Sequence, residues 1–160
     1  AFLIAKAYRY DVKGKNYIYT PRKYYFSDVE LRNACLGFRQ QEENHLMENI
    51  IYNELVGRGY NVDVGIVEIG EKNDNGNYVR KQLEVDFVGN RGYDRIYVQS
   101  AWRIDSEEKM QQERRPLLRI DDSFRKIVVL RDYGKKWKDE QGILYLGLKE
   151  FLLDEKAIDG

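Results

Sequence analysis

Positions 83 to 88 read Leu83-Glu84-Val85-Asp86-Phe87-Val88, and this stretch decides the expected fold. Strict alternation predicts a strand with Leu83, Val85 and Phe87 on one face. The other face then holds Glu84, Asp86 and Val88, so two acids share it. Two acids on one side of an otherwise apolar strand can hold a hard divalent cation through oxygen. We therefore expect a buried sheet with a candidate metal site on this strand.

The neighbouring segments extend the sheet on both sides of this stretch. Val79 to Val88 is predicted as one strand, preceded by a strand from Tyr60 to Ile69 and followed by one from Arg95 to Trp102. The last of these sends Gln99, Ala101 and Arg103 to one side. Glycines at 57 and 59 close a long helix predicted from Glu43 to Val56.

The remaining segments complete the order helix, three strands, helix, strand, strand, helix. This order predicts an α/β (α+β) domain in which a mixed sheet is flanked by helices. We expect strands at 2–12, 17–20, 126–131 and 143–146, the second of them ended by Pro21, and a polar loop at 132–142. We expect helices from Ser27-Asp28 to about 36, from Asp105 to about 115 and at 148–153. Pro116 should break the second of these helices.

The long helix carries acids on or beside its apolar face. That face is formed by Met47, Ile50, Ile51 and Leu55. Glu54 points into it and Glu48 lies at its edge. An unpaired buried carboxylate costs several kcal/mol, so each acid needs a metal, a cation or hydrogen-bond donors. Pairing with an arginine stays open as the alternative.

A helix glutamate, a strand aspartate and a polar residue on the next strand resemble the layout of the PD-(D/E)xK nuclease superfamily. The resemblance implies a restriction-endonuclease-like core in which Glu48, Asp86 and Gln99 bind Mg²⁺ or Mn²⁺, with Glu54 and Glu84 as alternates. It also implies a lysine two residues after Gln99, where this chain has Ala101. Arg103 stays protonated and can only stabilise charge on phosphate. We therefore expect a weak or vestigial catalytic site.

A second resemblance covers nearly the whole chain. The stretches at 8–15, 23–28, 31–33, 45–50, 84–88 and 97–99 are similar, in this order, to the C-terminal domain of certain archaeal and bacterial AAA-type ATPases. The resemblance implies ATPase and winged-helix parts of the parent chain as partners. It implies that residues 1–22 are a β-hairpin appendage left from the winged-helix segment and 23–160 the nuclease-like domain. ATP would bind only in the parent's ATPase domain, since no Gly-x-x-x-x-Gly-Lys-Ser/Thr motif occurs here.

Composition narrows the chemistry further. Lys plus Arg and Asp plus Glu are both 27, so any attraction for phosphate must be local. One cysteine, Cys35, and one histidine, His45, exclude an internal disulfide, a thiolate zinc site and an all-histidine site. A single thiol without a signal peptide predicts a cytoplasmic protein, and no apolar run reaches the roughly 20 residues of a membrane helix.

Basic residues lie among tyrosines near the N-terminus. Lys13 and Lys15 occupy the predicted turn beside Arg9, and Tyr8, Tyr10, Tyr17 and Tyr19 flank them. Together with Arg103, these cations are candidates for contact with nucleic acid, DNA included. The alternative is that the tyrosines only pack the hairpin and the lysines keep an edge soluble.

Three functions remain open from the sequence. The first is a nucleic-acid-binding or partner-binding accessory domain of an AAA-type ATPase with a degraded nuclease site. The second is an active nuclease dependent on Mg²⁺ or Mn²⁺. The third is a purely structural domain that serves assembly.

Overall fold

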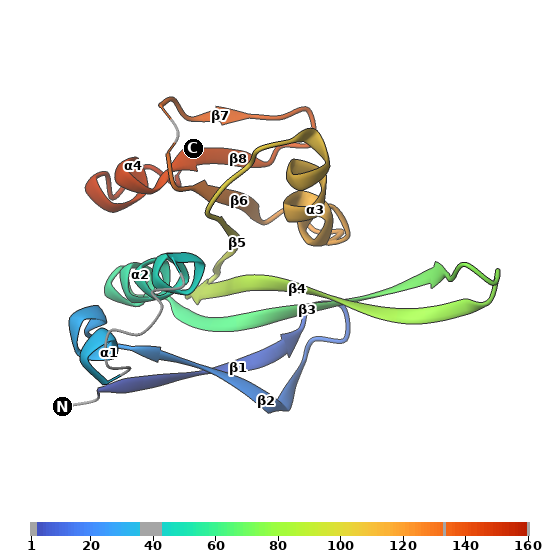
Figure 1. The fold of residues 1–160 in the computed structure, drawn as a ribbon, viewed down its shortest axis with the longest axis horizontal. Helices are drawn as coiled ribbons and strands as arrows, with labels where there is room; N and C mark the ends of the chain where they lie inside the picture. Colours follow the sequence, from blue (N-terminus) through green and yellow to red (C-terminus); the bar gives the residue numbers. More distant parts are fainter. Residues whose placement is uncertain (1–2, 36–42, 133, 160) are drawn as a thin grey trace.

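The computed structural model describes residues 3–35, 43–132 and 134–159. Within these ranges eight strands form one sheet in the order β2-β1-β3-β4-β5-β6-β8-β7 (Figure 1). The strands are β1 (Ile4–Asp11), β2 (Asn16–Phe26), β3 (Asn61–Lys72), β4 (Tyr78–Arg91), β5 (Asp94–Ala101), β6 (Arg125–Leu130), β7 (Trp137–Lys138) and β8 (Leu144–Gly147). The helices are α1 (Val29–Cys35), α2 (Glu43–Gly57), α3 (Glu107–Leu118) and α4 (Leu148–Leu153).

The sheet is mixed, which confirms the predicted class. Strands β3, β4 and β5 form an antiparallel meander. Helix α3 then crosses over to β6, which runs parallel to β5, and β8 runs parallel to β6. A parallel neighbour requires such a crossover because a tight turn can only reverse the chain.

Helices cover both faces of the sheet. On one face α2 and α4 bury Met47, Ile51, Leu55 and Phe151 in a cluster with Phe87 and Val98. On the other face α3 adds Leu117 to a cluster with Val85, Val88, Tyr97 and Ala101. Figure 1 shows α2 and α4 close together and α3 apart from them. The apolar stripe predicted for α2 is therefore confirmed at Met47, Ile51 and Leu55, which are fully buried.

Beside the sequence 83–88 the meander contains a β-bulge. The β3–β4 register shifts between Asp63 and Gly65, where two residues of β4 oppose one of β3. Val85 and Val88 consequently lie in one core cluster and Phe87 in the other. The predicted alternation, with Val85 and Phe87 on one face and Val88 on the other, is wrong, because the extra residue resets the period.

The N-terminal hairpin is continuous with the main sheet. Strand β1 pairs in parallel with β3 along Arg9–Asp11. Strand β2 passes through Pro21, which lies at an irregularity in its pairing with β1, so the predicted strand end at Thr20 is wrong. The boundary between residues 22 and 23 therefore falls inside β2, and the winged-helix origin of residues 1–22 stays a prediction.

Two further expectations differ from the structure. The third predicted helix begins after Ser106, whose side chain accepts a hydrogen bond from the Lys109 N–H, and it continues through Pro116 to Leu118. The polar loop at 132–142 contains the short strand β7, which pairs with β8.

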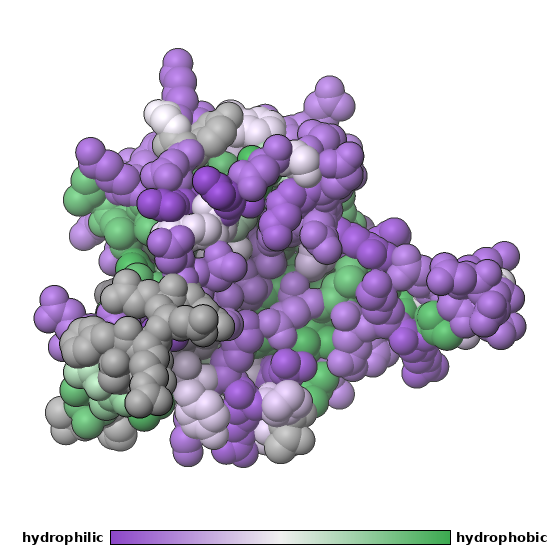
Figure 2. Space-filling view, in the orientation of Figure 1, coloured by the Kyte–Doolittle hydropathy of each residue, from purple (hydrophilic) through white to green (hydrophobic). Residues whose placement is uncertain are grey.

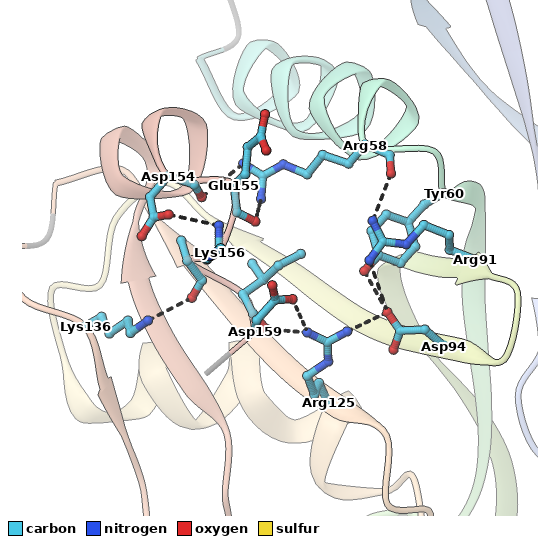
Figure 3. Close-up of polar contacts among 12 residues, drawn as sticks. Arg58, Tyr60, Arg91, Asp94, Arg125, Lys136, Asp154, Glu155, Lys156 and Asp159 are labelled. Carbon is cyan, nitrogen blue, oxygen red and sulfur yellow. Dashed lines mark hydrogen bonds and ion pairs between the residues drawn. The ribbon is translucent and has the colours of Figure 1, made fainter.

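An ionic network fastens the C-terminal segment to the sheet (Figure 3). The Arg125 guanidinium lies between Asp94, at 2.5 Å, and Asp159, at 2.9 Å. The Arg58 guanidinium donates to the main-chain carbonyls of Phe151 and Glu155. These contacts hold the last turn of the chain against α2 and β6.

The face of the molecule shown in Figure 2 is mostly hydrophilic, and so is the arm formed by the outer half of the β3–β4 hairpin. Among the described residues, no helix combines the length and the apolar character needed to cross a bilayer.

Candidate functional site

Side chains from two helices and two strands open into one cavity of about 500 Å³. Glu48 comes from α2, Asp86 from β4, Gln99 from β5 and Glu113 from α3. The structure thus brings together the three residues that the sequence singled out as the primary set, and Glu113 joins them.

The cavity forms where β4 and β5 separate. Their hydrogen-bonded register ends at the pair Phe87 and Val98. Beyond this pair the side chains replace the ladder: the Ser100 N–H donates to Oδ2 of Asp86 at 2.7 Å, and the Asp86 N–H donates to Oε1 of Gln99 at 3.4 Å. Asp86 and Gln99 therefore bridge β4 and β5 where the main-chain ladder has ended, and these hydrogen bonds fix their orientation.

The charged form of Asp86 is disfavoured in this position. The residue is only 7% exposed. Burial, and then the nearby charge of Glu48, raise the pKa of Asp86 to about 8, although the Ser100 N–H and Lys23 act in the opposite direction. A carboxyl in this state favours a cation or a proton as neighbour.

Lys23 of β2 brings a cation into the same group. Its ammonium lies 3.3 Å from Oε2 of Glu48 and 2.6 Å from Oε1 of Glu84. Burial acts to lower the pKa of Lys23, but the carboxylates of Glu48 and Glu84 outweigh it and raise that pKa above its ordinary value. The ammonium therefore stays charged and offsets part of the negative charge of the site.

The Gln99 side-chain amide is hydrogen-bonded to both Asp86 and Glu113. Its oxygen accepts from the Asp86 N–H, and its side chain is hydrogen-bonded to Glu113. Burial raises the pKa of Glu113, and the contacts with Lys109 and Gln99 oppose this. An amide oxygen used in this way is a weak ligand for a metal.

The alternate acids lie in different surroundings. Glu54 forms an i,i+4 pair with Arg58 at 2.8 Å and does not line the cavity, so the arginine alternative holds for this residue. Glu84 pairs with Arg9 at 3.1 Å and with Lys23. It also contributes to the raised pKa of Asp86, so it lies close to the site without lining the cavity.

The expected lysine position cannot serve the cavity. Ala101 is 1% exposed and packs in the core cluster on the α3 face. Arg103 lies beyond the end of β5, lines the rim of the cavity and pairs with the exposed Asp105 at 3.4 Å. A group that activates water at this strand position is therefore missing.

The donor set fits a magnesium-like cation held by few protein ligands. Carboxylate oxygens of Glu48 and Asp86 face one cavity, and Mg²⁺ is commonly held by one or two carboxylates with waters completing the shell. The described residues contain no metal-binding arrangement of three or more His, Cys, Asp or Glu side chains. A cation bound by these two carboxylates would take the rest of its coordination shell from water.

The four predicted nucleic-acid residues do not form one surface. Arg9 is held by Glu84, and Arg103 lies at the rim of the acidic cavity. Lys13 and Lys15 line a different cavity between the hairpin turn and the β4–β5 turn. Several tyrosines do pack the hairpin, as the alternative expected: Tyr17 contacts Tyr8 and Tyr10 edge to face.

Sequence reasoning missed Lys23 and Glu113. Lys23 precedes Asp86 by 63 residues. It reaches the site because β2, β1, β3 and β4 are neighbours in the sheet, and no local sequence pattern reveals this order. Glu113 lies on α3 near its partly buried Met110 and buried Leu117, so its place three residues after Met110 was the available signal.

The chain is similar to an uncharacterised protein from Haemophilus influenzae. The two are 34% identical over 153 residues, which cover 96% of this chain and 34% of the relative. The chain therefore spans about a third of the length of the curated relative it matches. No protein-family model matches the chain, and no solved structure matches it.

Proposed function

We propose that this chain is a nucleic-acid-binding accessory domain of an AAA-type ATPase, built on a PD-(D/E)xK, restriction-endonuclease-like core whose cutting site is reduced. The observation that carries the proposal is the common cavity of Glu48, Asp86 and Gln99. They come from a helix, the central strand of the meander and the next strand, which is the arrangement that the resemblance leads one to expect.

Three features argue against efficient cutting. Ala101 is buried at the lysine position, so no amine follows Gln99 on β5. The Gln99 oxygen is already hydrogen-bonded to the main chain. Lys23 lies against two carboxylates and remains protonated, so it is a poor base.

The same residues support weak binding of a divalent cation. Bound Mg²⁺ or Mn²⁺ would neutralise the site and polarise a phosphate oxygen. Glu48 and Asp86 would hold it, and the Ser100 N–H keeps the Asp86 carboxylate turned toward the cavity edge. Four acids line this cavity against two cations, Arg103 and Lys109, so without a bound metal it disfavours phosphate. Tight binding of nucleic acid must therefore use another surface.

A second candidate is an active nuclease dependent on Mg²⁺ or Mn²⁺. The position of Lys23 favours it, because an ammonium 3.3 Å from Glu48 stands beside the cation site and can stabilise a phosphate transition state. In that case β2 supplies the positive charge that the strand position of Ala101 lacks.

One experiment separates these functions. Fluorescently labelled single-stranded DNA, double-stranded DNA and RNA are mixed with the chain in Mg²⁺, Mn²⁺ or EDTA, with Asp86→Asn in parallel. We expect salt-dependent binding and uncut substrate under every condition. Cleavage that requires metal and disappears in Asp86→Asn overturns the non-cutting proposal in favour of the nuclease. Absence of binding at low salt overturns both and leaves an assembly role.

A further inference from the structure

A second cavity, of about 710 Å³, lies at the other end of the β4–β5 pair. It is enclosed by the β1–β2 turn, the β4–β5 turn and the segment after α3, which contribute Lys13 and Lys15, Tyr93, and Arg119 and Phe124. Its volume falls in the range of small-ligand pockets. Neither Glu48 nor Asp86 lines it.

The cations of this cavity are less engaged than its acids. Among the described residues neither Lys15 nor Arg119 forms an ion pair, and both are exposed. Asp94 instead pairs with Arg125 at 2.5 Å and accepts from the Tyr60 hydroxyl at 2.8 Å, as Figure 3 shows. Burial acts to raise the pKa of Asp94, but the hydrogen bonds from Arg125 and Tyr60 outweigh it and lower that pKa.

A second acid of the cavity is also occupied. Asp122 accepts a hydrogen bond from the Tyr97 hydroxyl at 2.6 Å and from the Phe124 N–H at 3.1 Å. Four cations and three acids line the cavity. Two of the acids, Asp94 and Asp122, already bind Arg125 and Tyr97, which do not line it. The open side therefore presents a local excess of positive charge to an anion.

Aromatic rings border these cations. The Tyr93 side chain is fully exposed (104%) at the two-residue turn, where Gly92 has φ +60°. Phe124 is 39% exposed. The Arg95 guanidinium lies 5.1 Å from the Tyr10 ring centroid and 5.8 Å from that of Phe124, so it contacts two aromatic rings of the cavity lining.

We propose that this cavity binds single-stranded nucleic acid, with Lys15 and Arg119 on phosphates and Tyr93 stacked on a base. Cations beside exposed aromatic rings are the combination that holds single strands without regard to sequence. This inference rests on the proposed function and names the surface that carries it. Asn90 at the cavity wall lies four positions after Asp86 on β4, a rise of roughly 13 Å along the strand, so this cavity and the acidic one are separate sites on the same strand.

The test is the affinity of the chain for labelled oligo-dT and a matched duplex, measured by fluorescence anisotropy in EDTA over a range of salt. The double variant Lys15→Gln/Arg119→Gln is expected to bind the single strand more weakly. It should also make the slope of log K against log salt shallower by about 1.4, because each phosphate contact on a single strand contributes about 0.7. Tyr93→Ala is expected to bind at least fivefold more weakly, with an unchanged slope.

The matched control is Lys135→Gln/Lys149→Gln, which removes two exposed cations elsewhere and is expected to change neither affinity nor slope. Thermal melts verify that every variant is folded, as the exposure of the substituted residues predicts. Wild-type binding that both cavity variants leave unchanged overturns the inference while the proposed function stands. Duplex bound more tightly than the single strand also overturns it. Absence of wild-type binding overturns the proposed function itself.

Discussion

The main-chain N–H of Ser100 donates to Oδ2 of Asp86 across the gap where β4 and β5 separate, at 2.7 Å. The ladder between these strands has ended at Phe87 and Val98. A buried carboxylate thus takes the place of a main-chain carbonyl. It serves the fold and faces the candidate cation site at the same time, which links stability to the charge of that site.

The raised pKa of Asp86 predicts a fall in stability with rising pH. Its pKa of about 8 in the folded chain exceeds the ordinary 3.8, so between these values the folded state binds more protons than the unfolded state. The free energy of unfolding should therefore decrease as the pH rises from about 4 to about 8, by at most several kcal/mol. Asp86→Asn keeps an acceptor for Ser100 and should lose this component. Urea melts of both proteins across this range measure it, and parallel pH profiles would exclude it.

Lys23 should compete with a divalent cation. Its ammonium contacts both Glu48 and Glu84, so Lys23→Gln removes a positive charge from beside the cation site. We expect the melting temperature of Lys23→Gln to rise more steeply with Mg²⁺ than that of the wild type, because ligand binding to the folded state stabilises it. Lys81→Gln, which removes an exposed cation paired with Glu71, is the control. A smaller Mg²⁺ effect in Lys23→Gln would contradict competition.

The β-bulge should depend on Gly65. A Cβ at this position would lie 2.8 Å from Cγ2 of Val88 and 2.9 Å from Cβ of Val85. Gly65→Ala should therefore lower the free energy of unfolding by about 1–3 kcal/mol, the usual cost of overpacking. Gly57→Ala, where the new Cβ meets no atom within 4 Å, should be neutral or stabilising. Chemical denaturation compares them, and equal effects would argue against the bulge.

The Arg125 network should contribute measurably to stability. Its guanidinium joins Asp94 of β5 to Asp159 near the C-terminus, and about a third of its side chain is exposed. Arg125→Gln is expected to cost about 1–2 kcal/mol after allowance for solvent screening. Arg103→Gln removes an exposed pair with Asp105 and should cost less than about 0.5 kcal/mol. A comparable loss in both variants would show that Arg125 is only a surface contact.

Local patterns predicted the elements better than their long-range contacts. The spacing of Met47, Ile51 and Leu55 was sufficient to predict α2, and the alternation of apolar and acidic residues around Asp86 was sufficient to predict β4. The bulge escaped prediction because period-two alternation assumes an unbroken ladder. Pro116 lies within the last turn of α3, where a helix can end soon after it.

The site was predictable only in part for the same reason. Glu48, Asp86 and Gln99 follow from a helix and adjacent strands that are close in sequence. Lys23 enters from β2 through sheet neighbours fixed by tertiary pairing. The cavity with Tyr93 and Arg119 joins three separate turns, and turns carry little positional information in a single sequence.

The shared cation site is tested most directly by calorimetric titration of Mn²⁺ into four proteins: wild type, Glu48→Gln, Asp86→Asn and Glu54→Gln. Weak binding is expected in the wild type, with loss in Glu48→Gln and in Asp86→Asn. Glu54→Gln should bind as the wild type does, because Glu54 pairs with Arg58 away from the cavity. Wild-type protein that binds no Mn²⁺, or binding that survives both the Glu48 and the Asp86 substitution, would contradict a common site.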